Sequence, residues 1–223
     1  QRSSLVKLRN ETEQSRLEKA DEERRLRTLE QKRGRSLARA ERQQQQVAAR
    51  LAQIARDEAR LSAVLASLDS ARRRADSRPG AAPPAGSTLS PRDLGRLDWP
   101  VEGTILYRFG RQVNPNNTTI RWNGIGIGAA LGTPVKAVSA GTVEYAERMG
   151  TYGLMVIVNH GANDYSLYGS LARADVAKGA RIAKGQVIGT VGTSDPDLDP
   201  HLHFEIRPNG RAVDPFDWLR TNR

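Results

Sequence analysis

Apolar residues in the first third of the chain recur at the spacing of a helix. They form a seam with steps of three and four residues, in which Glu58 fills the one polar position, and its members are Val47, Leu51, Ile54, Leu61, Leu65 and Leu68. Residues 1–78 contain no proline and one glycine, Gly34, and are rich in the helix-favouring Arg, Glu, Gln, Ala and Leu. The pattern predicts coiled-coil helices over residues 1–78 that need a partner helix. It leaves open whether Gly34 marks the turn of a hairpin or lies within one long helix.

A linker is predicted over residues 79–98. Proline and glycine are concentrated in residues 79–89, and both residue types end helices. Ser90 followed by Pro91 is typical of a helix N-terminus, so we expect a short helix that ends before Trp99.

Beyond the linker the pattern changes to short apolar runs separated by Gly, Asn, Asp and Pro, which is typical of β-strands. The runs are Ile105–Tyr107, Ile125–Ile127, Val135–Val138, Thr142–Tyr145, Leu154–Val158, Ser166–Tyr168, Gln186–Val191 and Leu202–Ile206. We therefore expect an α plus all-β fold class, with the coiled-coil helices followed by an antiparallel β-sheet domain over residues 99–223.

Charge is concentrated in the helical part. The formal net charge is +10; residues 1–78 carry 20 basic against 12 acidic side chains, and residues 79–223 carry 15 against 13. Acidic side chains are interleaved with the basic ones and no nucleic-acid motif accompanies them, so we expect a solvated helix surface and no nucleic-acid partner. The sequence has no cysteine and no apolar run long enough to span a bilayer. It begins with Gln1, and we expect that a signal peptide was removed.

Two of the three histidines lie in one alternating segment, residues 200–207. Strand periodicity places His201, His203, Glu205 and Arg207 on one face and the intervening apolar residues on the other. Two imidazoles on one strand face can hold zinc or move protons. Asp195, Asp197 and Asp199 lie just upstream; a polar turn-forming loop is the favoured interpretation of these three, with replacement metal ligands as the alternative.

The β-domain resembles the LytM-type, or lysostaphin-type, zinc peptidases, which cut peptide cross-links in bacterial cell wall. The resemblance rests on segments such as Trp99-Pro100-Val101, Gly150-Thr151-Tyr152-Gly153, Asn159-His160-Gly161 and His201-Leu202-His203-Phe204-Glu205. It implies zinc ligands at the His and Asp of a His-x-Gly-x-Asp motif and at the second His of His-x-His. The first two positions hold Trp122 and Gly126 here, and a further catalytic His position holds Ser170.

The resemblance therefore implies a domain that is not an enzyme, with no catalytic residue and no cofactor. An indole N–H cannot bind a cation, and glycine offers no side chain. His201 and His203 remain as residual metal candidates. The alternative reading, which those two histidines motivate, is a zinc-dependent peptidoglycan endopeptidase with an altered site.

A coiled coil followed by such a degenerate domain resembles EnvC-type murein hydrolase activators. This implies a periplasmic protein of the bacterial envelope that activates an N-acetylmuramoyl-L-alanine amidase during cell division, with the coiled coil docked on a membrane complex similar to an ABC transporter. Peptidoglycan is a further expected partner, and a passive peptidoglycan-binding scaffold is a third reading. The expected amidase-binding groove comprises Trp122, Asn123, Tyr152, Met155, Tyr168, His201, His203 and Arg207.

Autoinhibition is also expected, because a tethered segment has a high effective concentration at a neighbouring groove. Residues 90–98 or the end of the long helix are the two candidates for the inhibitory segment.

Overall fold

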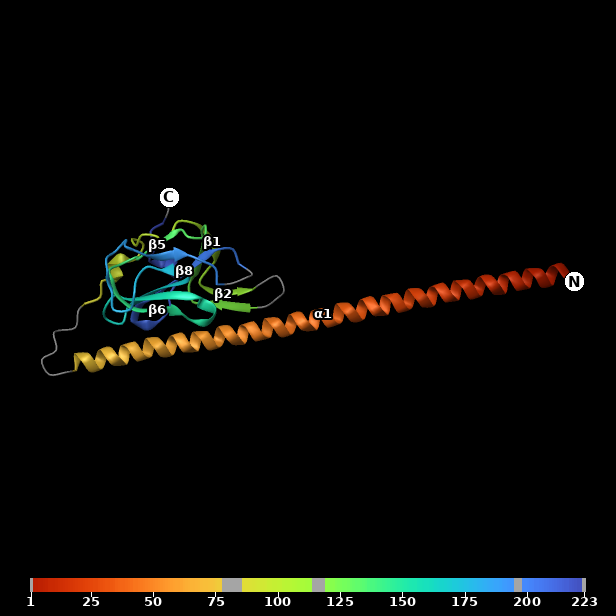
Figure 1. Cartoon of the computed structure of the whole chain (residues 1–223), viewed down its shortest axis with the longest axis horizontal. Helices are drawn as coiled ribbons and strands as arrows, with labels where there is room; N and C mark the ends of the chain where they lie inside the picture. Colours follow the sequence, from red (N-terminus) through yellow and green to blue (C-terminus); the bar gives the residue numbers. More distant parts are fainter. Residues whose placement is uncertain (1, 78–85, 114–118, 195–197, 222–223) are drawn as a thin grey trace. The chain divides into compact units, whose positions relative to one another are not determined.

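A single uninterrupted helix forms the N-terminal part of the chain. The computed structural model describes residues 2–77, 86–113, 119–194 and 198–221, with only the backbone of residues 6, 75 and 76. Helix α1 spans Arg2–Asp76 and passes Gly34 without a break (Figure 1). Gly34 therefore lies within one long helix and marks no hairpin turn. No described helix has the length and apolar composition that a bilayer span requires.

The chain forms two compact units, residues 1–52 and residues 53–223. The expected domain boundary at residue 78 differs from this division. The reason is that the last part of α1 packs on the β-strands, so residues 53–76 belong structurally to the β-domain.

The β-domain contains strands at all eight of the predicted apolar runs. They are β1 (Thr104–Tyr107), β4 (Ile125–Gly128), β5 (Pro134–Lys136), β6 (Gly141–Arg148), β7 (Leu154–Asn159), β8 (Tyr165–Ala174), β10 (Val187–Val191) and β11 (His201–Arg207). With β9 (Arg181–Ile182) they form an antiparallel nine-stranded sheet in the order β1-β4-β11-β8-β7-β6-β9, in which β10 pairs with β5 and β8 (Figure 1). The predicted α plus all-β fold class is confirmed.

Apolar side chains are buried on both sides of strands β7 and β8, and on one side of β11. The main core includes Leu202, Phe204 and Ile206 of β11, all fully buried. A second, smaller core lies on the opposite face, where Leu61 and Leu65 of α1 pack with residues of β7 and β8. This corrects the expected partner of the helical seam: its buried part contacts a sheet, where a second helix was predicted.

The second half of the predicted linker is part of the β-domain. Leu89 and Leu97 are buried in the main core, and Leu97 forms a parallel bridge with Leu219. The predicted helix start at Ser90 is confirmed as a short 3₁₀ helix, η1 (Pro91–Asp93), in which the Ser90 and Asp93 side chains cap one another's backbone. The first half of the linker, residues 79–85, lies outside the described residues.

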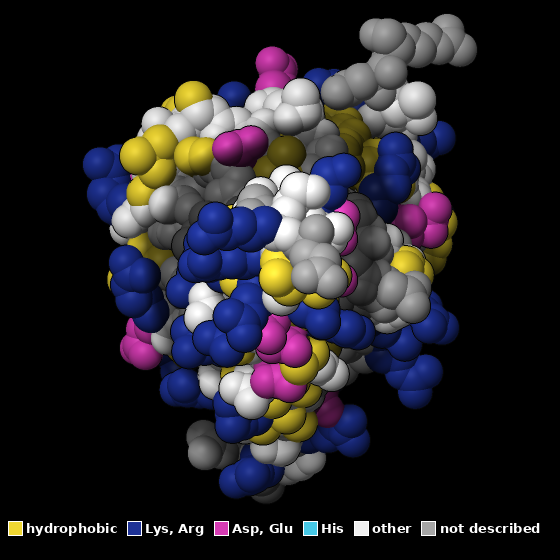
Figure 2. Space-filling model, turned by 90° about the vertical axis from the view of Figure 1, so that its right-hand side faces the viewer, with side chains coloured by type: hydrophobic (Ala, Val, Ile, Leu, Met, Phe, Trp, Pro, Cys, Tyr) yellow, Lys and Arg dark blue, Asp and Glu magenta, His cyan; other side chains and the backbone are white. Residues whose placement is uncertain are grey.

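Pattern analysis missed the two-residue strand β9 and the antiparallel pair β2 (Gly110–Val113) and β3 (Thr119–Trp122). The pair is the larger of the two omissions. Its exposed residues include Arg111 and Arg121, so no apolar alternation marks it. Basic side chains outnumber acidic ones on the molecular face shown in Figure 2, in line with the net charge of +10. The described residues also form the short 3₁₀ helices η2 (Gly150–Tyr152), η3 (Pro208–Gly210) and η4 (Pro215–Asp217).

Candidate functional site

Strand β11 places four polar side chains on one face of the sheet, as its alternation predicts. We call this the histidine face and define it by His201, His203, Glu205 and Arg207. All four residues are at least 93% buried, which a half-buried strand would not require. The face is therefore covered, and buried charges need partners to offset their desolvation.

A chain of hydrogen bonds connects the buried polar groups of the histidine face. The Tyr107 hydroxyl lies 2.8 Å from Nδ1 of His203, and Nε2 of His203 lies 2.8 Å from Oε1 of Glu205. Arg207 donates through Nε to Oε2 of Glu205 at 2.6 Å and through its terminal nitrogen to Oε1 of Glu58 at 3.1 Å. Because an ionised carboxylate only accepts, Nε2 of His203 carries the proton that it shares with Glu205. The buried charges are thus paired.

These contacts shift the pKa values of the groups involved. Burial alone would raise the pKa of Glu205, but the hydrogen bond from His203 and the charge of Arg207 outweigh it and hold that pKa below its usual value. Burial opposes the charge of Arg207, yet Glu205 and Glu58 raise its pKa. Burial and the two nearby carboxylates raise the pKa of Tyr152, so its hydroxyl stays a neutral donor. At neutral pH Glu205 is therefore ionised and Arg207 is charged.

Helix α1 covers one end of this face. The Tyr152 hydroxyl donates to Oε2 of Glu58 at 2.6 Å, so one carboxylate serves both Tyr152 and Arg207. The preceding residue, Asp57, accepts a hydrogen bond from the Thr151 backbone N–H at 2.8 Å. A Cβ at Gly150 would overlap with the Asp57 carboxylate, so this close approach of helix to loop requires glycine at that position. The helix contact is therefore shaped by specific polar groups as well as by apolar packing.

The apolar part of the helix contact is the second core. Leu61 is fully buried and Leu65 is 5% exposed, against Met155, Ile157 and Leu167. Burial of a leucine side chain contributes about 1.5–3 kcal/mol. The two leucines alone therefore stabilise the docked helix by roughly 3–6 kcal/mol before the entropy of ordering is deducted.

Two of the three positions at which the resemblance implies zinc ligands do not fit the metal. Trp122 stacks on the Tyr107 ring, with centroids 3.9 Å apart and an interplanar angle of 16°. Any side chain at position 126 would overlap with the same Tyr107 ring, because a Cβ at Gly126 would lie 2.6 Å from two atoms of that ring. Within the described parts of the chain, no three His, Asp or Glu side chains are grouped so that they could hold a metal ion. No catalytic step can be derived through zinc from these residues.

The remaining catalytic position is equally unsuited to proton transfer. Ser170 is fully buried, and its hydroxyl has no hydrogen-bond partner among the described residues. His201 donates from Nδ1 to the backbone carbonyl of Asp199, 2.7 Å away. Asp195 and Asp197, the other alternative ligands, lie outside the described residues.

The structure brings most of the predicted groove residues together, with one exception. Met155 lies in the second core beneath α1, Tyr152 contacts Glu58, and Asn123 is half-buried in the turn between β3 and β4. Tyr168 lies on the opposite face of the sheet, fully buried in the main core. Its hydroxyl accepts the Val138 backbone N–H at 2.9 Å, so the predicted place of Tyr168 in the groove is corrected to a core position.

Three residues at or beside the histidine face were not predicted as site residues: Glu58 and Tyr107 contact it, and Asp57 contacts the neighbouring loop at Thr151. Glu58 interrupts the apolar seam, and that interruption was a usable signal for a polar contact. Tyr107 and Asp57 carried no such signal. Both act through contacts with residues far away in the sequence, which periodicity does not report.

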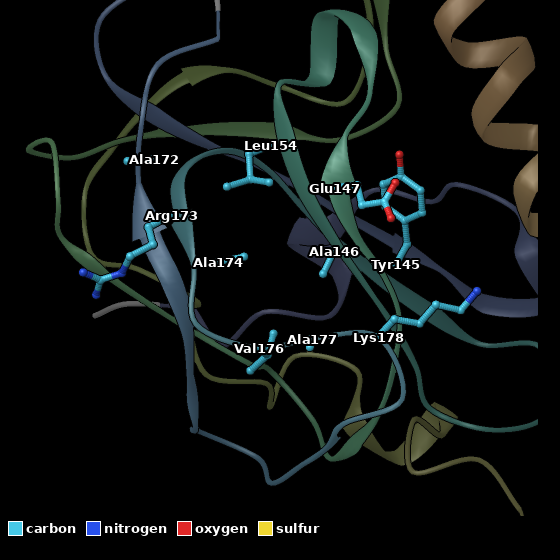
Figure 3. A pocket seen from close by; sticks show the side chains of 10 residues that line it. All are labelled: Tyr145, Ala146, Glu147, Leu154, Ala172, Arg173, Ala174, Val176, Ala177 and Lys178. Atoms are coloured by element: carbon cyan, nitrogen blue, oxygen red, sulfur yellow. The ribbon is translucent and has the colours of Figure 1, made fainter.

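A pocket of about 700 Å³ lies elsewhere in the β-domain (Figure 3). It is lined mainly by small apolar side chains of β6, β7, β8 and the loop that follows β8, with Glu147, Arg173 and Lys178 as its charged residues. None of its lining residues belongs to the histidine face or to the predicted groove, so we do not include it in the candidate site.

Comparison with known proteins places the histidine face in a recognised domain. Residues 121–215 match the model of Peptidase family M23. The chain is 45% identical over 125 residues to the murein hydrolase activator EnvC of Escherichia coli, which covers 56% of this chain and 29% of that protein. It is 38% identical over 108 residues to the DD-carboxypeptidase/endopeptidase Mpg of Neisseria meningitidis, covering 48% of this chain and 25% of that protein.

A third relative is the cell division protein DipM of Caulobacter vibrioides, 32% identical over 128 residues and covering 57% of this chain and 20% of that protein. This chain thus spans less than a third of the length of each of these relatives. A crystal structure of a zinc-containing peptidase from Vibrio cholerae has the same fold, with a TM-score of 0.51 and 24% identity over 56% of this chain and 40% of that one. Residues 121–215 of this chain therefore form a Peptidase family M23 domain.

Proposed function

We propose that this chain is a non-enzymatic activator of a peptidoglycan amidase, with its M23 domain as the amidase-binding module. The observation that carries the proposal is the aromatic pair Tyr107 and Trp122, which fills the region where the family resemblance implies a zinc site. Similarity to EnvC supports an activator role, and similarity to DipM supports a role in cell division. The place of action that follows is the periplasm, at the cell wall.

The histidine face is the proposed amidase-binding surface. It offers a buried Arg207 and is bordered by the aromatic side chains of Tyr107, Trp122 and Tyr152. Arginine and aromatic residues dominate binding hot spots, and an amphipathic helix in a groove is a common recognition mode. A helix of the amidase is the proposed occupant, with the N-terminal part of α1 left to dock on a membrane complex.

The same surface supports the proposal that α1 is the inhibitory segment. Residues 53–76 bring Glu58 onto Arg207 and Tyr152 and bury two leucines. Residues 90–98, the other candidate, contribute Leu97 to the main core. A partner helix has to displace α1 before it reaches Arg207. Activation then requires a force or a ligand that favours the undocked helix.

The experiment is release of labelled fragments from purified peptidoglycan by the full chain alone, by an N-acetylmuramoyl-L-alanine amidase alone, and by both together. We expect no release by the chain alone and faster release by the two together, most clearly when α1 is undocked. Chelator-sensitive release by the chain alone would instead support a zinc endopeptidase. Co-sedimentation with peptidoglycan without any change in amidase rate would support a passive scaffold.

A further inference from the structure

The side chain of Tyr107 contacts all three positions at which the resemblance implies a zinc ligand. Its ring stacks on Trp122 at 3.9 Å between centroids. It fills the space above Gly126, where a Cβ would lie 2.6 Å from the ring atoms Cδ1 and Cζ. Its hydroxyl lies 2.8 Å from Nδ1 of His203. A single side chain thus lies at the point on which the three positions converge.

The environment of His203 is that of a metal-binding histidine with a phenol in place of the metal. Histidines that bind a metal through one ring nitrogen usually donate the other N–H to a carboxylate or carbonyl, which fixes the ring. His203 donates Nε2–H to Glu205, a fully buried carboxylate that Arg207 holds in turn. The opposite nitrogen, Nδ1, faces the Tyr107 hydroxyl. The orienting half of a ligand is therefore complete, and the coordination position is taken by an oxygen of the protein.

Tyr107 reaches this position because β1 pairs with β4 in a register that shifts between Ile105 and Tyr107, where Tyr107 lies opposite Gly126. Position 126 in turn lies opposite His203 across β4 and β11. Any side chain at position 126 would collide with the ring. The strand pairing therefore makes the position of the Tyr107 ring depend on glycine at 126.

We propose that Tyr107, a residue outside the zinc-ligand motifs, occupies the metal position of this M23 domain and closes it to zinc. Loss of the ligands at 122 and 126 is then only half of the change, and restoring both would not restore the metal site. The inference deepens the proposed function and rests on its non-enzymatic role, because it states what physically excludes the metal. It also assigns Tyr107 a structural task, which is to connect β1, β3, β4 and β11 as a bound metal would connect its ligands.

The test compares two sets of substitutions in the full chain. The first variant, Trp122→His/Gly126→Asp, restores the ligand types and keeps Tyr107. The second adds Tyr107→Ala. Each is dialysed against zinc, zinc content per chain is measured, and Co²⁺ is added separately to record the absorption of a tetrahedral site. Circular dichroism confirms the fold. We expect about one zinc per chain and a tetrahedral Co²⁺ spectrum only in the variant that includes Tyr107→Ala. The variant that keeps Tyr107 is expected to bind zinc at least tenfold more weakly.

A second pair keeps Gly126, because the aspartate of the first variant would collide with Tyr107 and could unfold the domain. Trp122→His alone is compared with Trp122→His/Tyr107→Ala, and we again expect at least tenfold tighter zinc binding in the variant that lacks the phenol. Equal zinc affinity with and without Tyr107, or no zinc in a folded Tyr107→Ala/Trp122→His/Gly126→Asp variant, would overturn the proposal. Amidase stimulation by the unaltered chain is a separate measurement, so a failure of the proposed function and a failure of this inference are distinguishable.

Discussion

Glu58 of helix α1 accepts a hydrogen bond from Arg207, which lies 149 positions further along the chain, at 3.1 Å. The same carboxylate accepts from Tyr152. Arg207 belongs to the buried chain of hydrogen bonds that continues through Glu205 to His203. The helix thus contributes the terminal carboxylate of a polar network whose other members come from the β-domain. Any event that withdraws the helix leaves Arg207 with one carboxylate partner among the described residues, and opens a cationic and aromatic surface.

The first prediction concerns this carboxylate. Glu58→Gln keeps the size of the side chain but removes its charge, which leaves Arg207 with weaker pairing and favours the undocked helix. Amide hydrogen exchange of residues 53–76 is expected to rise about tenfold, the change that corresponds to roughly 1.4 kcal/mol of docking free energy. Glu41→Gln, on an exposed part of the same helix, is the matched control and is expected to leave exchange unchanged. Identical exchange in the Glu58 variant and the unaltered chain would show that the pair does not hold the helix.

A second prediction separates the two faces of the sheet. Tyr168→Phe leaves the buried Val138 N–H without its partner, and such a loss costs about 1–3 kcal/mol of unfolding free energy. Because Tyr168 lies in the main core, amidase stimulation per folded molecule is expected to stay unchanged. Denaturant unfolding and the stimulation assay measure the two quantities. A variant with full stability and reduced stimulation would place Tyr168 back on the binding surface.

The pH dependence of stability gives a third prediction. Burial lowers the pKa of His160 below its usual value of 6.5, outweighing its contact with Ala140 and the charge of Asp164. The folded state therefore binds this proton less readily than the unfolded chain does. Its neutral form is stabilising above pH 6.5, and this stability is lost as the pH falls toward the lower folded value.

The free energy of unfolding of the unaltered chain is thus expected to be lower at pH 5.5 than at pH 7.5. His160→Gln removes the titrating group and is expected to reduce the decrease, whatever its effect on stability at pH 7.5. A decrease of the same size in both proteins would exclude His160 as its source. The low pKa of Glu205 acts in a separate window, below its usual value of 4.5.

Periodicity predicted the strands well because each face of a strand has its own environment. The alternation of β11 correctly placed His201 and His203 on one face with Arg207, and the motif positions led to Trp122 and Gly126. Tyr168 was misplaced because its face depends on the register between β8 and β11, in which it lies opposite Phe204. The register is set by the tertiary structure, and neither sequence motifs nor amino-acid composition predict it.

Contacts between distant segments account for the remaining differences. The seam in α1 correctly indicated that Leu61 and Leu65 need a partner, but an apolar stripe does not specify whether a helix or a sheet covers it. Tyr107 lies in a short strand with no motif, and its role depends on what stands at position 126, 19 residues later. The sequence therefore predicted the loss of the metal ligands and missed the side chain that fills their place.

The most direct test of the account is amidase stimulation by a full chain whose helix cannot dock. Leu61→Asp/Leu65→Asp places two carboxylates in the second core and removes about 3–6 kcal/mol of apolar burial, so α1 should leave the histidine face. Leu26→Asp/Leu29→Asp makes the same change at positions of α1 that are 54% and 60% exposed, and serves as the control. We expect the first variant to stimulate peptidoglycan release by an amidase at least tenfold more than the unaltered chain or the control, with no release in the absence of amidase. Equal stimulation by all three proteins, or release of peptidoglycan fragments without an amidase, would contradict the account.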